Sequence, residues 1–299
     1  MRYADRNGKT DGVGNMHGKW EASWSALLVD KLASGAERDD PRVAPGDYAH
    51  AAMQYYRALR QHPVRGKHVL VAGSISPWLE SIALSRRAAS VSTVDYIAPR
   101  TTSQRLTIYT MAQLARGDGS SGGGDIGGRP SVGGSFDAIF SYSSVEHDGL
   151  GRYGDPINPY GDIAAMGEFA LLLKPGGILY LGLPVGREGI AGQGQRFYDL
   201  GRFSKLTHGW ELLATHSAIP SCICGSDPAH YVKNGAPLCC PGWRNLSVAA
   251  RITTWNGSNF WVPPLDGIGL REHWTNQPLF VLRQTAASLP AAMQAVGAA

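Results

Sequence analysis

Short apolar runs alternate with amphipathic stretches over most of the chain, and this pattern predicts a doubly wound parallel α/β sheet. The runs are rich in aliphatic and β-branched residues, as strands buried on both faces are. The strand-like runs are residues 68–72, 90–94, 136–141, 178–183, 210–213 and 279–282. The helix-like stretches are residues 78–87, 104–116, 162–173 and 197–208. Asp162 is placed to cap the third of these helices.

Two amphipathic helices are predicted ahead of this sheet. In the first, apolar residues recur at steps of three and four from Trp20 to Leu32, with Leu27 and Leu28 among them. The second spans residues 48–60 and carries tyrosine, alanine and leucine on one side. These helices either close over a site as a lid or pack against the sheet.

The chain therefore divides into an ordered centre and less regular ends. Residues 1–18 are polar and Gly-rich and are expected to be disordered, as is the Ala-rich tail over residues 285–299. Between them we predict a helical extension over residues 19–65 and one α/β domain over residues 66–284. Within that domain, the Gly-rich residues 117–134 are expected to form a flexible insertion.

The cysteines lie in a second, irregular insertion over residues 216–247. One residue separates Cys222 from Cys224, and Cys239 is adjacent to Cys240. Zinc sites usually place paired cysteines two or more residues apart. We therefore interpret these cysteines as free thiols and predict no metal site.

The charge balance and hydropathy exclude some partners. The sequence has 28 Lys and Arg residues against 24 Asp and Glu residues, and its net charge of +4 without a long basic run argues against a nucleic-acid partner. No stretch approaches the roughly 18 apolar residues of a membrane span. The N-terminal stretch lacks the apolar core of a secretory signal. We expect a cytoplasmic protein with no membrane partner, or one in the secretory-pathway lumen if an anchor is missing from this chain.

Candidate chemistry gathers where the predicted strands end, which is where doubly wound sheets bind ligands. Gly73 follows the first strand, and a residue without Cβ lets the backbone approach a ligand there. Asp95 ends the second strand, 22 residues beyond Gly73. Its carboxylate either accepts hydrogen bonds from the hydroxyls of an adenosine ribose or is simply solvated. The loop over residues 141–162 is dense in Glu, His, Asp, Arg and Tyr, which indicates a substrate site.

Three segments together resemble the class I S-adenosylmethionine-dependent methyltransferases. They are residues 73–78 (GSISPW), 143–155 (SSVEHDGLGRYGD) and 174–177 (KPGG). More narrowly, they are similar to a branch of that superfamily that is catalogued as a domain of unknown function. The resemblance spans roughly residues 66–215, with residues 279–282 as the final strand.

The resemblance implies a Rossmann-like, mostly parallel sheet of seven strands whose last strand is antiparallel, with S-adenosylmethionine as the cofactor. It implies cofactor contacts from residues at the strand ends: Gly73, Ser74, Asp95, Tyr96, Ser141 and Tyr142. The sequence departs from the superfamily at the first turn. An acidic residue and three spaced glycines are usual there, and here the positions hold Val71, Gly73, Ile75 and Pro77.

A substrate hydroxyl that attacks the methyl group would gain from a general base. His147 is the first candidate because the pKa of a histidine ordinarily lies near neutrality; Asp148 is the second and Glu146 the third. Alternatively, Glu146 and His147 only brace the loop or line the cofactor pocket. Acceptor binding is expected from the polar residues that follow in the same loop: Arg152, Tyr153, Asp155 and Asn158.

The sequence thus predicts methyl transfer from S-adenosylmethionine to a hydroxyl of a small molecule or glycan. The alternative is a catalytically inactive methyltransferase-fold protein that acts as a binding or scaffold module, which the altered Gly turn favours. A nicotinamide-dependent oxidoreductase is less well supported, because it needs a G-x-G-x-x-G turn that residues 73–78 do not supply.

Overall fold

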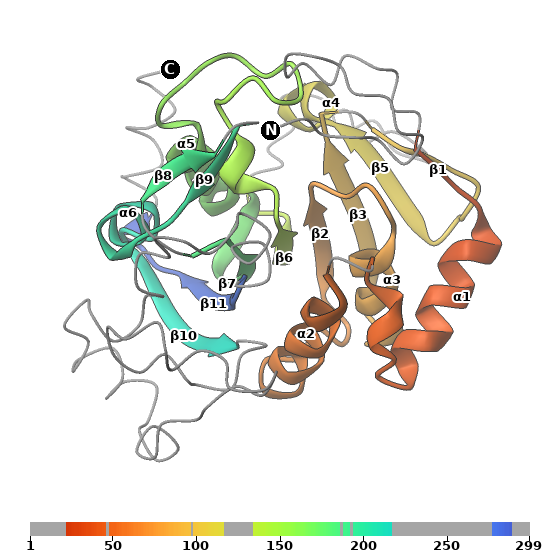
Figure 1. Cartoon of the computed structure of the whole chain (residues 1–299). Coiled ribbons are helices and arrows are strands. Elements are labelled where there is room, and N and C mark those ends of the chain that lie inside the picture. The colour runs from red at the N-terminus through yellow and green to blue at the C-terminus, as the bar shows by residue number, and fades with distance from the viewer. Residues whose placement is uncertain are drawn as a thin grey trace, which may run out of the picture.

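A sheet of seven strands runs through the part of the chain that the computed structural model describes (Figure 1), in the order β10-β11-β7-β6-β2-β3-β5. The described residues are 22–45, 48–96, 98–116, 134–185, 188–191, 194–216 and 277–288. The seven strands are β2 (His68–Ala72), β3 (Ser90–Asp95), β5 (Leu106–Thr110), β6 (Phe136–Tyr142), β7 (Leu173–Gly182), β10 (Trp210–His216) and β11 (Leu279–Gln284).

The sheet is mostly parallel. Adjacent strands are parallel to one another from β5 through β3, β2 and β6 to β7. β11 pairs antiparallel with both β7 and β10. The predicted α/β fold with a mostly parallel central sheet is therefore confirmed. The predictions for residues 1–18, for nearly all of the Gly-rich insertion and for the cysteines fall outside the described residues.

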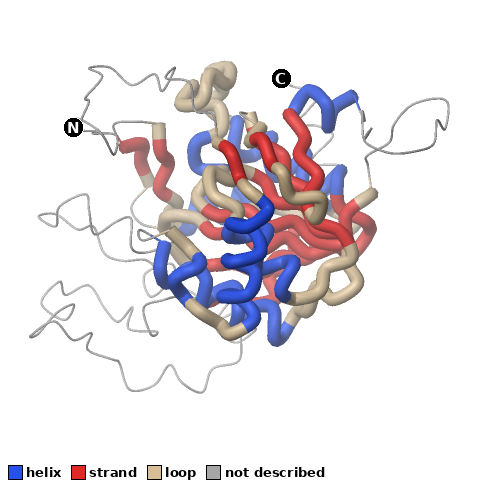
Figure 2. Tube along the Cα trace, turned by 90° about the vertical axis from the view of Figure 1, so that its right-hand side faces the viewer, coloured by secondary structure: helices blue, strands red, loops and turns tan. Residues whose placement is uncertain are grey.

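Alternate residues of the central strands feed two separate cores. In β2, Val69 and Val71 pack among residues of α1, α2 and α3, whereas Leu70 and Ala72 pack among residues of α4, α5 and α6. The sheet therefore lies between two groups of helices (Figure 2), as strands buried on both faces require. The helices are α1 (Ala26–Glu37), α2 (Ala49–Gln61), α3 (Trp78–Ser85), α4 (Met111–Arg116), α5 (Gly161–Leu172) and α6 (Leu200–Leu206). No helix in the described ranges is both long and apolar enough to cross a bilayer.

Two small sheets accompany the central one. β1 (Ser23–Trp24) pairs in parallel with β4 (Arg100–Thr101), so the N-terminal extension is attached beside β3 and β5. β8 (Gly189–Ala191) pairs antiparallel with β9 (Gln195–Phe197). Each small sheet lies against one side of the region where β2, β3 and β6 end (Figure 1).

The single helix predicted over residues 104–116 is wrong. Its first half is β5, which pairs with β3 from Leu106 to Thr110, and only its second half is helical, as α4. β-branched and aromatic residues favour a strand in this segment, and the open edge of β3 gives that strand a partner. Residues 197–208 are likewise divided, because Phe197 ends β9 and α6 begins at Leu200.

The apolar stripe predicted for the first helix is wrong in part: Trp24 is buried and Leu32 packs against the core, but Trp24 lies in β1 and α1 begins only at Ala26. Leu27 is 79% exposed and Leu28 36%, while Val29, Ala33 and Ala36 are buried. α1 packs against α3 (Figure 1), and small side chains allow the two helices to approach closely. The second helix lies where it was predicted, and it packs against the sheet through its alanines and tyrosines.

Candidate functional site

A cavity of about 660 Å³ lies at the carboxyl ends of β2, β3 and β6. Its volume falls within the range of about 300–1,000 Å³ of small-molecule sites. Most of the predicted site residues line it: Gly73, Ser74, Asp95, Tyr96, Tyr142, His147, Asp148, Arg152, Tyr153, Asp155 and Asn158. Ser141 and Glu146 were also expected in the site, but both are fully buried and neither lines the cavity.

A buried carboxylate, that of Glu80, holds the turn after β2 through a hydrogen bond. Glu80, in the first turn of α3, is fully buried and accepts hydrogen bonds from Thr93 Oγ1 at 2.8 Å and Ser74 Oγ at 3.1 Å. The backbone N–H of Ser74 in turn donates to Asp95 Oδ2 at 2.9 Å. These bonds connect the turn to β3 and α3, so the turn has a rigid base even though the usual spaced glycines are replaced.

Gly73 lines the cavity and also allows a close contact between two turns. Its φ is +77°, and a Cβ at this position would lie 2.2 Å from Ser144 Oγ and 2.6 Å from Ser144 Cβ. Ser144, from the loop after β6, therefore packs directly against Gly73, and the cofactor contact of Gly73 stays a prediction. A glycine here allows the turns after β2 and β6 to pack together.

The N-terminal extension contributes to the cavity wall. Ala22, Pro45 and Tyr48 line the cavity, and Trp24 Nε1 donates to the carbonyl oxygen of Ile75 at 3.2 Å. The extension therefore covers the turn after β2. The structure shows the predicted packing of the two helices against the core, and their action as a lid over a site stays a prediction.

Aromatic side chains form one wall of the cavity. Tyr142 makes edge-to-face contacts with Tyr48 and Trp78, with ring centroids 5.4 Å and 5.7 Å apart. Tyr142 fits because residue 182, on the adjacent strand, is glycine: a Cβ there would lie 2.0 Å from its ring. The Tyr142 hydroxyl donates to the carbonyl oxygen of Gln277 at 3.0 Å, which orients the ring.

His147 is poorly suited to act as the general base. Its Nδ1 lies 2.7 Å from the carbonyl oxygen of Gly194, and a carbonyl only accepts, so Nδ1 carries the proton. Burial, followed by the charge of Arg152, lowers the pKa of His147 to about 3. The expectation that this pKa lies near neutrality is therefore wrong, because a cationic imidazole would be buried beside a guanidinium.

The other predicted bases differ in access to the cavity. Asp148 lines the cavity, and burial, followed by the charge of Asp155, raises its pKa well above the ordinary range. Glu146 lies behind the cavity wall, where its Oε1 accepts a hydrogen bond from Ser143 Oγ at 2.6 Å. Glu146 therefore reaches the cavity through Ser143, which lines it, and Oε1 is also 3.7 Å from Nε2 of His147, another lining residue.

Two of the predicted acceptor-binding residues also hold the loop together. Asp155 accepts hydrogen bonds from the backbone N–H groups of Gly151 and Tyr153, both at 3.1 Å. Asn158 Oδ1 accepts one from the backbone N–H of Tyr160 at 2.9 Å. Their side chains keep the loop in shape at the cavity edge.

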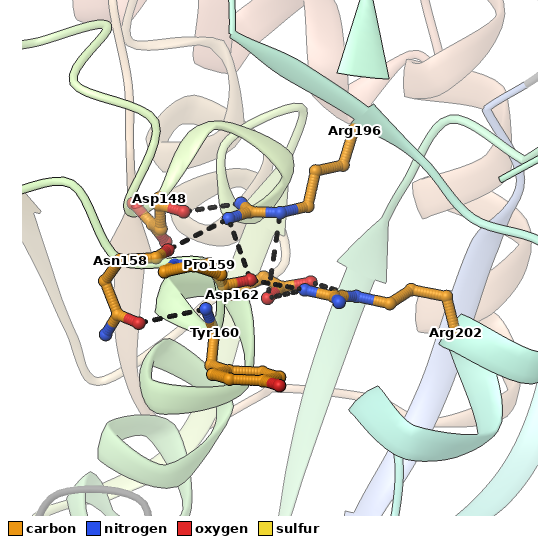
Figure 3. Close-up of polar contacts among 7 residues, drawn as sticks. All are labelled: Asp148, Asn158, Pro159, Tyr160, Asp162, Arg196 and Arg202. Atoms are coloured by element: carbon orange, nitrogen blue, oxygen red, sulfur yellow. Dashed lines mark hydrogen bonds and ion pairs between the residues drawn. The ribbon is translucent and has the colours of Figure 1, made fainter. Parts of the chain in front are cut away.

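Asp162 is a buried counter-ion rather than a helix cap (Figure 3). α5 begins one residue earlier, at Gly161, and the Asp162 carboxylate is fully buried. Arg202 Nε donates to Asp162 Oδ2 at 3.1 Å and Arg202 Nη2 donates to Asp162 Oδ1. Arg196 lies beside this pair, with Nε 3.9 Å from Asp162 Oδ1. Asp162 has this role because Arg196 and Arg202, from distant segments, lie beside its carboxylate. A sequence pattern does not show such a contact.

The same two arginines hold the cavity loop through its backbone carbonyl groups (Figure 3). Arg196 donates to the carbonyl oxygens of Asp148, Asn158 and Pro159, and Arg202 donates to that of Pro159. The loop over residues 148–162 is therefore closed on itself and attached to β9 and α6.

Replacing Gly149 with alanine should destabilise this loop and lower the free energy of unfolding by about 2 kcal/mol. Its φ is +75°, and a Cβ would lie 2.1 Å from the carbonyl oxygen of Asn158. Gly176→Ala is a matched control, because Gly176 has a φ of +77° with nothing within 4 Å of a Cβ. Urea unfolding of both variants isolates the clash, and equal losses would show that Gly149 is needed only for its backbone angle.

Several residues of the cavity were not predicted. Tyr48, Trp78, Ser143, Ser144 and Glu168 all line it. Trp78 lies within the motif over residues 73–78, and Ser143 and Ser144 lie within the motif over residues 143–155. These motifs therefore indicate a role for the three residues. Tyr48 had none, because a tyrosine at the start of an amphipathic helix is ordinarily a packing residue.

No metal centre is formed within the described ranges, since no three His, Cys, Asp or Glu side chains there are arranged to hold an ion. The cysteines that were predicted to be free thiols lie outside these ranges.

The chain was compared with known sequences, solved structures and family models. No curated protein sequence matches it. Among solved structures, it is similar to the Burkholderia thailandensis 1,6-didemethyltoxoflavin-N1-methyltransferase with bound 1,6-didemethyltoxoflavin and S-adenosylhomocysteine, at 12% identity over 87% of this chain and 88% of that one, with a TM-score of 0.43. It is also similar to an S-adenosylmethionine-dependent methyltransferase from Mesorhizobium loti, at 13% identity over 77% of this chain and 98% of that one, with a TM-score of 0.36.

A further similar structure is the branched-chain polyamine synthase from Thermus thermophilus in complex with N4-aminopropylspermidine and 5'-methylthioadenosine. The identity is 15% over 87% of this chain and 64% of that one, with a TM-score of 0.42. At these identities the likeness to solved structures is one of fold. Residues 66–221 match the model of the family DUF268, described as "Caenorhabditis protein of unknown function", and because the match spans just over half of the chain, the chain belongs to this family.

Proposed function

We propose that this protein is an S-adenosylmethionine-dependent methyltransferase that acts on a hydroxyl of a small molecule or glycan. The observation that carries the proposal is an open cavity at the carboxyl ends of β2, β3 and β6 with Asp95 in its wall. In doubly wound sheets this is where nucleotide-like ligands bind. Side chains do not fill the cavity, as they would in a protein that kept the fold only as a scaffold.

The cavity residues fit S-adenosylmethionine in shape and chemistry. Asp95 uses Oδ2 to accept the Ser74 N–H, and a carboxylate has about four acceptor positions, so it can also accept from ribose hydroxyls. Met111 and Leu114 provide an apolar wall at the start of α4, beside the end of β5, that suits a flat adenine ring.

The charge of the cavity also suits a cationic ligand. Among the residues that the structure describes, the acidic side chains lining it are Asp95, Asp148, Asp155 and Glu168, and the basic side chain lining it is that of Arg152. A sulfonium brought into this cavity is attracted by the excess of carboxyl groups. Burial disfavours the charged forms of Asp148 and Glu168, and a nearby cation would favour both again.

The residues of the chain would then position an acceptor against the methyl donor. S-adenosylmethionine supplies a methyl group that is already activated by its sulfonium. Positioning is therefore the main task of the protein. Arg152 and Tyr153 offer a cation and a phenol at the cavity edge, and both suit an acceptor with several hydroxyl groups.

The alternative is a methyltransferase-fold protein that has lost activity and serves as a binding or scaffold module. Ser144 occupies the space beside Gly73, and Ile75 and Pro77 hold side chains where the superfamily usually has glycine. Both features reduce the backbone surface that a cofactor could approach. A direct binding measurement separates the two functions.

Isothermal titration calorimetry with S-adenosylmethionine and S-adenosylhomocysteine should show binding that Asp95→Asn weakens by about 10- to 100-fold. A hydrogen bond to a charged group contributes about 1.5–3 kcal/mol, and about 1.4 kcal/mol is tenfold in affinity. Asp137→Asn is the matched control, because Asp137 also accepts a backbone N–H, from His68 at 2.8 Å, but does not line the cavity.

If neither ligand binds the full chain, the methyltransferase proposal is wrong and the scaffold alternative replaces it. If both bind and Asp95→Asn has no more effect than Asp137→Asn, the cofactor lies elsewhere in the protein. Binding with the expected loss justifies a screen of hydroxyl acceptors with radiolabelled methyl donor.

A further inference from the structure

A chain of hydrogen bonds leads from the cavity to a buried carboxylate. The Tyr48 hydroxyl, in the cavity wall, donates to Ser143 Oγ at 3.1 Å. Ser143 Oγ donates to Glu146 Oε1 at 2.6 Å. Each hydroxyl gives its proton to the next group, and the chain ends at an acid.

The direction of this chain is fixed by what surrounds Ser143. Gln277 Nε2 donates to Ser143 Oγ at 3.4 Å, so the hydroxyl oxygen accepts from both Gln277 and Tyr48. Its own proton is then directed to Glu146. Three segments far apart in sequence supply these groups: the start of α2, the loop after β6 and the residue pair before β11.

Ser143 is held in a strained backbone conformation. Its φ is +54°, which is uncommon for a residue with a Cβ. Its N–H donates to the carbonyl oxygen of Gly182 at 3.1 Å, which holds the residue at the end of the paired strands β6 and β7. Such strain is found where the position of a side chain matters to function.

Glu146 has the capacity to take a proton. It is fully buried, and its Oε2 has no hydrogen-bond partner among the described residues. Burial raises the pKa of Glu146 to about 7, against the bond from Ser143 and the charge of Arg152, which lower it. The titratable and charged groups that face it are His147, whose Nε2 is 3.7 Å from Oε1, and Arg152, Asp148, Tyr142 and Tyr198.

We propose that Tyr48, Ser143 and Glu146 form a proton relay that accepts the proton of the acceptor hydroxyl as its oxygen is methylated. This inference rests on the proposed function. The acceptor oxygen forms a bond to the methyl carbon while the carbon–sulfur bond breaks and leaves its electron pair on sulfur. The hydroxyl proton passes to Tyr48 Oη, the Tyr48 proton to Ser143 Oγ, and the Ser143 proton to the Glu146 carboxylate, which later releases it to water.

The relay assigns the base to Glu146, reached through Tyr48 and Ser143, in place of His147. A base works best when its pKa is near the working pH. Glu146 meets this condition, and His147, whose pKa is about 3, does not. Tyr48 lies outside the residues that match the family model, so the test requires the full chain.

Infrared difference spectroscopy as a function of pH tests the relay without any ligand. Glu80 also titrates near neutrality, because burial raises its pKa to about 7. The series is therefore built in a Glu80→Gln background. Burial also raises the pKa of Asp148 and of Glu168, so the measured quantity is the part of the protonated-carboxyl band that Glu146→Gln removes. We expect this part to disappear with a midpoint near pH 7.

The same titration distinguishes a relay from an isolated buried carboxyl group. The hydrogen bond from Ser143 lowers the pKa of Glu146 in the wild type. Ser143→Ala removes this bond and should therefore move the midpoint to higher pH. Tyr48→Phe should move it in the same direction by less, since Tyr48 acts through Ser143. Tyr160→Phe is the control, because Tyr160 is 64% exposed and should leave the midpoint unchanged.

A band near pH 7 that Glu146→Gln leaves unchanged, or a midpoint that neither Ser143→Ala nor Tyr48→Phe moves, would overturn the relay. Calorimetry with S-adenosylmethionine keeps this result separate from the proposed function. The wild type should bind the cofactor whether or not the relay operates. Loss of cofactor binding by the wild type itself would instead reject the methyltransferase and leave the hydrogen-bonded chain as a structural feature only.

Discussion

Replacing Asp162 with asparagine should lower the free energy of unfolding by about 3 kcal/mol. The carboxylate is fully buried, and Arg202 binds both of its oxygens while Arg196 lies next to the pair. Asparagine keeps the shape of the side chain but removes its charge. Two guanidinium groups then remain in a buried region without a counter-ion, which is costly because a buried charge loses its hydration.

Urea unfolding followed by circular dichroism measures this loss. Asp30→Asn is the matched control, because Asp30 pairs with Arg105 at 2.8 Å while both side chains are about half exposed. An exposed pair contributes less than about 1 kcal/mol. An Asp162→Asn variant as stable as Asp30→Asn would mean that Arg196 and Arg202 are satisfied by the loop carbonyls alone.

The same substitution should loosen the wall of the cavity. Arg196 and Arg202 hold the carbonyl oxygens of Asp148, Asn158 and Pro159, and Asp162 fixes the position of both guanidinium groups. The loop that carries the predicted acceptor-binding residues is therefore coupled to a buried ion pair.

Much of the fold could be predicted because its signals are local. The apolar runs of β2 and β3 predict buried parallel strands, and the structure places both strands at the expected residues. The errors arise where a neighbour decides the outcome. Residues 106–110 form a strand because they pair with the edge of β3. Leu27 is exposed because α1 packs on α3 through small residues instead.

The candidate site was predictable in location but less so in chemistry. The motif around residues 143–155 located the cavity loop, because strand ends and polar loops are visible in sequence. The properties of its acids and bases were not visible, because they depend on burial and on charges from distant segments. The pKa of His147 is lowered by burial and by Arg152, and Glu80 was overlooked because a glutamate in a helix is ordinarily solvated.

Glu80→Gln should remove a strong pH dependence of stability. Burial raises the pKa of Glu80 from 4.5 to about 7 in the folded protein. Between these pH values the folded state holds a proton that the unfolded state has released, so the wild type loses stability as pH rises from about 4.5 to 7. A shift of this size corresponds to about 3 kcal/mol.

Glutamine keeps the shape of Glu80 and does not titrate, so the variant should gain about 3 kcal/mol relative to the wild type between pH 4.5 and pH 8. Thr93 and Ser74 hydroxyls can rotate to accept from the new amide, which limits its own cost. Chemical unfolding at both pH values gives the difference, and the exposed Glu37→Gln serves as the control. If the difference between Glu80→Gln and wild type is the same at pH 4.5 and pH 8, the pKa of Glu80 is the same in the folded and unfolded protein, and Glu80 is ionised at neutral pH. The carboxylate beneath the turn after β2 would then add a fixed negative charge next to Asp95, and the preference of the cavity for a cationic ligand would be stronger than its lining residues alone indicate.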